Sequence, residues 1–180
     1  RGQGQSTCDD ADYAIEEFAD YLKAIIDELG LKPENTNLVG ISSGTLVQAE
    51  FMRKYPDTFH KCVMSGVMLT PQKTFQLQNL FAIRTMKTDI TLWVESLYCL
   101  LFSDYFVEAI EPFIPNLKAA LNERYKDRVH ALSNIMMAQN RYVADIAKYH
   151  GDYKKNNHEI VIIAGDEDRI TPTFYQKRVL

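Results

Sequence analysis

The stretch Asn37-Leu38-Val39-Gly40-Ile41-Ser42-Ser43-Gly44 decides the fold. Its first five residues form a short apolar run bounded by turn-forming residues, as expected of a buried strand. A helical pattern then runs from about Thr45 to Lys54 and stops before Pro56. The pattern GxSxG also arises by chance, so its place between a strand and a helix is what gives it meaning. The stretch predicts a strand, a sharp turn at Ser42 and a helix.

Two more apolar runs, at residues 62–67 and 160–164, predict strands buried on both faces, as parallel sheets require. Upstream, residues 9–29 carry apolar side chains at spacings of three and four, which predicts an amphipathic helix packed on one face. These side chains are Phe18, Leu22, Ile25, Ile26 and Leu29. Gly30 is placed as a C-cap, and Pro33 prevents continuation of the helix. The alternation of strands and helices predicts an α/β fold.

About 90 residues separate the second and third runs, far more than an ordinary connection, and their pattern is mostly helical. We expect residues 70–150 to form a helical lid, and residues 1–69 and 151–180 to form the core of a single domain. Eight aromatic residues of the lid stand at helical spacings, which favours lid core over substrate wall. They are Phe75, Phe81, Trp93, Tyr98, Phe102, Tyr105, Phe106 and Phe113.

A serine on a strand-to-helix turn exposes its hydroxyl at the carboxyl edge of the sheet, where a nucleophile can reach a substrate. The backbone N–H of Ser43 starts the following helix, so it can donate to the oxyanion of an acyl intermediate. Ser42 is therefore the candidate nucleophile and Ser43 N–H one oxyanion donor. The alternative is a turn that uses small residues only for close packing.

The third run is followed by Gly165-Asp166-Glu167-Asp168-Arg169-Ile170-Thr171-Pro172. This loop belongs to the same sheet edge as Ser42, which is the edge where α/β sheets bind ligands. Asp168 is the candidate acid that orients an imidazole base and stabilises its charged form. The alternative is a solvated acidic loop.

These segments resemble the α/β-hydrolase fold family, in the branch of proline iminopeptidases, haloperoxidases and esterases. Arg1-Gly2-Gln3-Gly4-Gln5-Ser6 looks like the RGxGxS loop of that branch, residues 40–44 like its nucleophile elbow, and Gly165-x-x-Asp168 with Pro172 like its acid loop. The resemblance implies a mostly parallel sheet with helices on both faces and a helical lid, Ser42 as nucleophile and Asp168 as acid. Ser43 and Thr45 depart from the larger residue and the second glycine common beside the elbow.

The family orders its triad as Ser, acid, His, and no histidine follows Asp168. His60 and His158 precede strands and belong to the opposite sheet edge, and His130 and His150 lie in the lid. Three strands alone would also leave unpaired edges. The resemblance therefore implies a longer enzyme of about 250–300 residues, with a second oxyanion donor before Arg1 and the base after Leu180. The 180 residues by themselves are expected to be inactive.

Composition excludes several other classes. The net charge is −4 without a basic run, which argues against nucleic acid, and no apolar stretch is long enough to span a membrane. Three cysteines, Cys8, Cys62 and Cys99, form no CxxC pair, which favours a reducing, cytoplasmic location. Gly2-x-Gly4 lacks the third glycine of a dinucleotide motif, and no metal-ligand spacing occurs. We expect no cofactor and no metal; the oligomeric state stays open.

The first hypothesis is a serine hydrolase that cleaves an ester, thioester or amide of a small or hydrophobic substrate through an acyl-enzyme on Ser42. Two alternatives keep the same fold. One is a non-catalytic ligand-binding relative, because fold alone does not establish chemistry. The other is an acyltransferase that uses the same nucleophile.

Overall fold

The computed structural model describes residues 1–7, 11–149, 152, 155 and 157–179. Three parallel strands form its sheet in the order β1-β2-β3: β1 (Asn37–Ile41), β2 (Lys61–Ser65) and β3 (Glu159–Ile163). The register pairs Ile41 with Ser65 and Ser65 with Ile163, so all three strands end at one edge. Each predicted strand is present, within two residues of its expected ends, and the parallel α/β prediction is confirmed.

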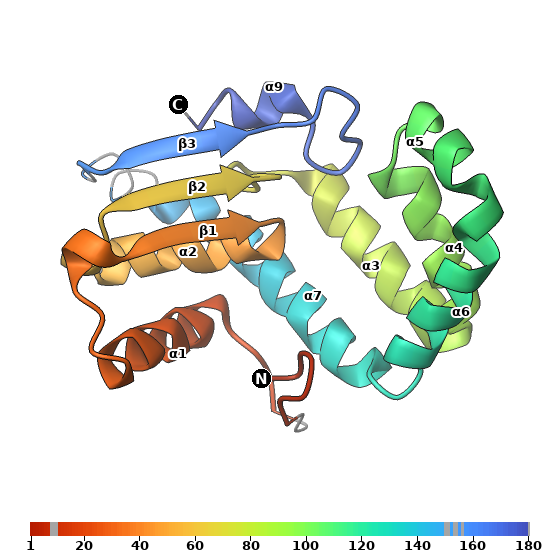
Figure 1. Ribbon diagram of the computed structural model, residues 1–180, viewed down its shortest axis with the longest axis horizontal. Coiled ribbons are helices and arrows are strands. Elements are labelled where there is room, and N and C mark those ends of the chain that lie inside the picture. The colour runs from red at the N-terminus through yellow and green to blue at the C-terminus, as the bar shows by residue number, and fades with distance from the viewer. Residues whose placement is uncertain (8–10, 150–151, 153–154, 156, 180) are drawn as a thin grey trace.

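Helices α1 (Ile15–Glu28), α2 (Ser43–Lys54) and α7 (Val129–Asp145) pack against one another below the sheet (Figure 1). They enclose the main core with alternate strand residues, among them Leu38, Cys62 and Met64. Short 3-10 turns, η1 (Pro33–Asn35) and η2 (Pro56–Thr58), connect these helices to the strands that follow them. Alternation along each strand therefore directs one set of side chains into the core.

The other face of the sheet is open. Val39 and Ile41 are 73% and 71% exposed, and Val161 and Ile163 are 45% and 54% exposed. The prediction that the strands are buried on both faces is wrong for the described residues, because none of the described helices covers these side chains. An apolar groove of about 530 Å³ also runs between α1, α2 and the unpaired edge of β1.

Helix α1 begins later than expected. The prediction of a helix over residues 9–29 includes residues 9 and 10, outside the described residues, and the helix starts only at Ile15 because Ala14 is extended. Its buried face consists of Ile15, Ala19 and Ile26, whereas the predicted Ile25 and Leu29 are 55% and 64% exposed. The helix does end as predicted at Gly30, which has φ +60° and donates to the Asp27 carbonyl.

A helical segment joins β2 to β3. It contains α3 (Lys73–Thr88), α4 (Ile90–Leu101), α5 (Asp104–Ile110), η3 (Glu111–Phe113), α6 (Ile114–Tyr125), α7 and η4 (Ile146–Tyr149). Helices α4, α5 and α6 lie beyond the carboxyl ends of the strands (Figure 1). A second hydrophobic cluster, with Trp93, Val94 and Tyr98 at its centre, holds α3, α4, α6 and α7 together. Among the described residues, none of the helices combines the length and apolar character needed to cross a membrane.

Candidate active site

Ser42 occupies the turn between β1 and α2 in a strained conformation. Its φ is 53° and its ψ −120°, and among the described residues it is the one non-glycine with positive φ. Its backbone N–H donates to the Ser65 carbonyl at 2.8 Å, which extends the pairing of β1 with β2 by one residue. Thr45 fixes the turn from the other side, because its N–H and its hydroxyl both donate to the Ser42 carbonyl, at 2.9 and 2.6 Å. The sharp turn predicted at this serine is present.

Two glycines border the turn: close packing requires Gly40, and the left-handed backbone conformation favours glycine at position 66. A Cβ on Gly40 would lie 2.1 Å from Gln48 Oε1 and 3.0 Å from the Gly44 carbonyl carbon. Gly66, directly after β2, has φ +66°, and a Cβ there would lie 3.6 Å from Ser42 N and 3.4 Å from Thr171 Oγ1. The elbow therefore touches the segment after β2 on one side and helix α2 on the other.

Ser42 is exposed, and its side chain caps none of the N–H groups of α2. Ser43 is the first residue of that helix, where backbone N–H groups have no partner within the helix. Such a group, at the positive end of the helix dipole, favours a negatively charged oxygen. The hydroxyl of Ser42, the candidate nucleophile, therefore neighbours the N–H of Ser43, the candidate donor to an oxyanion.

The acid loop, residues 165–172, follows β3 at the same sheet edge. Asp168 accepts three hydrogen bonds within it: Oδ1 from the N–H groups of Ile170 and Thr171, at 2.9 and 2.7 Å, and Oδ2 from the Thr171 hydroxyl at 2.5 Å. Thr171 also borders Gly66, which borders Ser42. The structure thus brings the predicted nucleophile and the predicted acid to one place, joined through Thr171 and Gly66.

No described histidine joins this group. His158 has one ring nitrogen 3.0 Å from the His60 carbonyl oxygen and the other 2.5 Å from that of Pro56, at the amino ends of the strands. His130 contacts Asn134 in α7 at 3.1 Å. His150 and Cys8 lie outside the described residues. Within the described ranges, no three His, Cys, Asp or Glu side chains gather as metal ligands do.

Arg169 joins the acid loop to the helical segment. Its Nη1 donates to the Cys99 carbonyl in the last turn of α4 at 2.9 Å, and its Nη2 lies 3.5 Å from Asp104 Oδ1 at the start of α5. In the described part of the chain, these are the polar contacts between the α4–α5 corner and the acid loop. They place that corner beside Asp168. Sequence reasoning did not single out Arg169.

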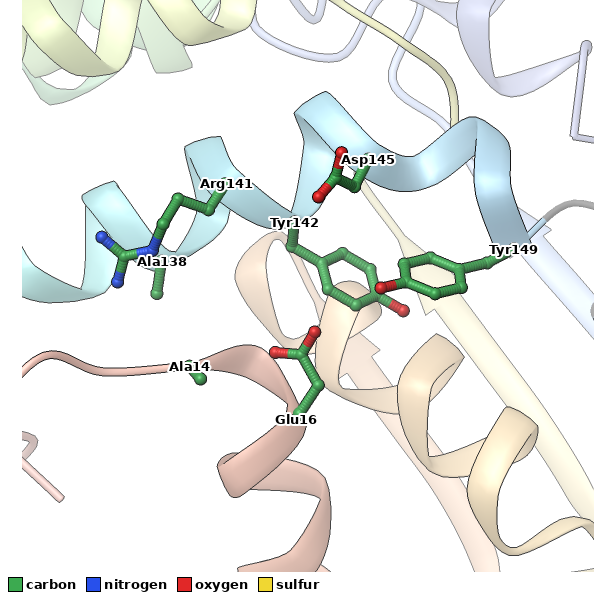
Figure 2. A pocket seen from close by; sticks show the side chains of 7 residues that line it. All are labelled: Ala14, Glu16, Ala138, Arg141, Tyr142, Asp145 and Tyr149. Carbon is green, nitrogen blue, oxygen red and sulfur yellow. The ribbon is translucent and has the colours of Figure 1, made fainter.

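A cavity of about 170 Å³ lies elsewhere, between the start of α1 and the end of α7 (Figure 2). It is lined by Ala14, Glu16, Ala138, Arg141, Tyr142, Asp145 and Tyr149. The rings of Tyr142 and Tyr149 stack with centroids 5.4 Å apart, and the Tyr142 hydroxyl donates to Glu50 Oε2 at 3.0 Å. None of the lining residues belongs to the carboxyl edge of the sheet, so this cavity is separate from the serine.

Glu50 is fully buried beneath that cavity. Arg53 donates to both of its carboxylate oxygens, at 2.9 and 2.6 Å, and these bonds raise the pKa of the guanidinium. The arginine in turn lies over the Tyr149 ring, 5.0 Å from its centroid. A buried carboxylate with all of these partners is satisfied, so the network serves to hold α2 against α7.

Comparison with known proteins agrees with the α/β fold. The sequence matches the alpha/beta hydrolase fold family over residues 1–180. Comparison with curated protein sequences yields no match. Solved structures that are similar over 99% of the chain include MGS-M2, an alpha/beta hydrolase enzyme from a Medee basin deep-sea metagenome library (TM-score 0.85, 23% identity). They also include a thermophilic esterase from Thermogutta terrifontis (TM-score 0.71, 18% identity) and a bromoperoxidase from Bacillus anthracis (TM-score 0.74, 20% identity). The chain spans only 63%, 64% and 66% of their respective lengths.

Proposed function

This chain belongs to the alpha/beta hydrolase fold family, and from that premise we propose a serine hydrolase in which Ser42 is the nucleophile. The substrate would be an ester, thioester or amide of a small or hydrophobic compound. One observation carries the proposal: an exposed serine holds φ 53° at a strand-to-helix turn, and Gly66 lies between that turn and the loop that holds the Asp168 carboxylate. Strained backbone of this kind persists where function requires it.

The chemistry follows from the positions of the groups. Ser42 Oγ attacks the carbonyl carbon, and the negative charge that develops on the carbonyl oxygen is stabilised by the Ser43 N–H at the start of α2. Asp168 is held by three hydrogen bonds within its own loop. These bonds hold the carboxylate in place, so that it can orient a base and stabilise the protonated form of that base. None of the described histidines joins Asp168, so the proposal requires an imidazole base from outside the described residues.

The helical segment of residues 70–150 is proposed to be the lid. Six of the eight aromatic residues at helical spacings fall into two groups: Phe75, Trp93 and Tyr98 are buried in the hydrophobic clusters, whereas Phe81, Tyr105 and Phe113 are at least 60% exposed. The buried residues pack within the main core or within the helical segment itself. The exposed group provides the candidate contacts for a hydrophobic substrate, since large exposed apolar side chains mark binding surfaces.

A fluorophosphonate probe tests the proposal in the whole protein. We expect stoichiometric labelling of Ser42, no labelling of Ser42→Ala and normal labelling of Ser103→Ala, a control serine at the start of α5. Asp168→Asn should label at least about 100-fold more slowly, because the base loses its orienting partner. An unlabelled wild-type protein would contradict the hydrolase function and favour a ligand-binding role. Acyl transfer to an added alcohol or thiol, in preference to water, would indicate an acyltransferase.

A further inference from the structure

The side chain of Gln176 bridges two segments of the candidate site. It lies in α9 (Thr173–Gln176) and is 2% exposed. Its Oε1 accepts from the Val67 N–H at 3.3 Å, and its Nε2 donates to the Thr171 carbonyl. One partner is a donor and the other an acceptor, so the amide fits in one orientation only. The bridge is buried and directional.

Both partners lead to the residues that the proposed function uses. Val67 follows Gly66, which packs against the backbone of Ser42. Thr171 gives two of the three hydrogen bonds that Asp168 accepts. The Gln176 amide therefore closes a ring of contacts that runs from the elbow through the segment after β2 to the acid loop.

The acid loop has few other constraints. Gly165, Asp166, Glu167 and Arg169 are all exposed, and the pairing of β3 with β2 ends at Ile163. Thr171 is the first buried residue after the strand, at 3% exposed. The position of the Asp168 carboxylate relative to Ser42 thus depends on how Thr171 is held.

We propose that Gln176 is a positioning residue that sets the place of the Asp168 carboxylate relative to Ser42, a role that rests on the proposed function. It acts through Thr171 and touches no reacting atom. Catalytic groups have to be held within about 0.5 Å of their productive geometry, and a displacement of about 1 Å can cost a hundred-fold in rate. Loss of the bridge should therefore reduce turnover and leave substrate binding nearly unchanged.

The test uses Gln176→Met in the whole protein, because methionine keeps the volume and removes both hydrogen bonds. With p-nitrophenyl acetate we expect kcat to fall about ten- to a hundred-fold while KM changes less than about two-fold. The acid limb of the kcat/KM profile should move to lower pH, because a displaced carboxylate stabilises the protonated base less. A variant that differs only in stability would change neither kcat nor the pH of the acid limb.

Gln72→Met is the matched control. Gln72 is also a buried glutamine, at 1% exposed, but its Nε2 donates to Thr70 at 3.3 Å, and within the described residues no hydrogen bond joins it to the acid loop. We expect it to keep the wild-type kcat and pH profile. If Gln176→Met does not fold, Thr171→Val and Thr171→Ser examine the same ring: valine removes the hydroxyl donor to Asp168 and should lower kcat, and serine should restore most of it.

The outcomes separate the two proposals. If the probe labels the wild-type protein but Gln176→Met keeps its kcat, the positioning role alone is overturned. The same holds if kcat falls equally in Gln176→Met and Gln72→Met. If Gln176→Met does not fold, equal kcat values for Thr171→Val and Thr171→Ser also overturn the positioning role. Wild-type protein that no fluorophosphonate labels overturns the proposed function, and the positioning role with it.

Discussion

Replacing Ser42 by glycine should stabilise the protein and abolish its activity. Ser42 holds φ 53° and ψ −120°, where its Cβ is crowded by the backbone. A non-glycine residue in such a sparsely populated region costs about 1–3 kcal/mol. Glycine has no Cβ and adopts positive φ as readily as negative φ. Ser42→Gly therefore removes the strain together with the nucleophile.

The net gain is smaller than the strain itself. Glycine also makes the unfolded chain more flexible, which costs roughly 0.5–1 kcal/mol on folding. The Ser42 side chain caps no N–H of α2, and we find no hydrogen bond to its hydroxyl among the described residues, so its removal has little further cost. The difference is a gain of about 0.5–2 kcal/mol in the free energy of unfolding. For a protein of this size that corresponds to a rise in Tm of about 1–8 °C.

Ser42→Ala is the matched comparison, because alanine keeps the Cβ and its strain. Urea unfolding of the three whole proteins should give wild type and Ser42→Ala nearly equal midpoints, and Ser42→Gly a higher one with the same slope. Both variants should lose ester hydrolysis by at least about 1,000-fold. A midpoint for Ser42→Gly at or below that of Ser42→Ala would refute the argument that this turn stores strain.

Three other perturbations have defined outcomes. Arg169→Ala should speed amide hydrogen exchange in α5 a few-fold and change the free energy of global unfolding by less than about 1 kcal/mol, because its contacts are solvent-exposed. Unchanged exchange in α5 would disprove the link between Arg169 and the helical segment. Arg53→Met should lower the free energy of unfolding, measured by urea denaturation at pH 7, by about 3 kcal/mol. The reason is that the substitution leaves the buried Glu50 carboxylate without its cation. A loss below about 1 kcal/mol would contradict this prediction. Burial raises the pKa of the Cys62 thiol to about 11, whereas Cys99 is exposed. In a Cys8→Ser background at pH 8, Ellman's reagent should therefore modify Cys99 quickly and Cys62 only on unfolding. Equal rates of modification would show that Cys62 is accessible in the native state.

The sequence was sufficient to predict the parallel sheet and the elbow. Each strand is a short apolar run between turn-forming residues, and the register aligns all three at one edge, as expected of parallel strands with helical crossovers. Residues that directly follow those runs, such as Ser42 and Asp168, could therefore be assigned to the same edge. Local pattern and topology were enough for these two residues.

The sequence could not predict in the same way which elements, if any, pack against each apolar surface. Periodicity shows which side chains share a face, but not what packs on that face. Ile25 belongs to the predicted stripe of α1, yet it lines the groove beside the unpaired edge of β1. Val39 and Val161 stand on the open face of the sheet. The expectation that further strands complete the sheet stays a prediction, and these are the side chains that such elements would have to cover.

The hydrogen bonds that join distant segments around the candidate site could not be predicted from the sequence either. Gln176 meets Val67 across 109 residues, and Arg169 meets Cys99 across 70. No spacing or motif connects positions so far apart, because the contacts arise only when β3 pairs with β2 and the helical segment folds back. Glutamine and arginine in a loop or short helix are otherwise typical of surface positions.

The two glycines of the elbow motif have different roles, and that difference separates a packing motif from a functional one. Gly40 is required by packing, because a Cβ there would overlap Gln48, whereas a Cβ on Gly44 would meet no atom within 4 Å. Close packing thus accounts for Gly40 but gives no reason for the strain at Ser42, whose exposed side chain neither fills a space nor caps α2. If the turn served packing alone, glycine would be the better residue at position 42. A strained, exposed serine at the same sheet edge as the hydrogen-bonded Asp168 carboxylate therefore supports the proposed role of Ser42 as nucleophile.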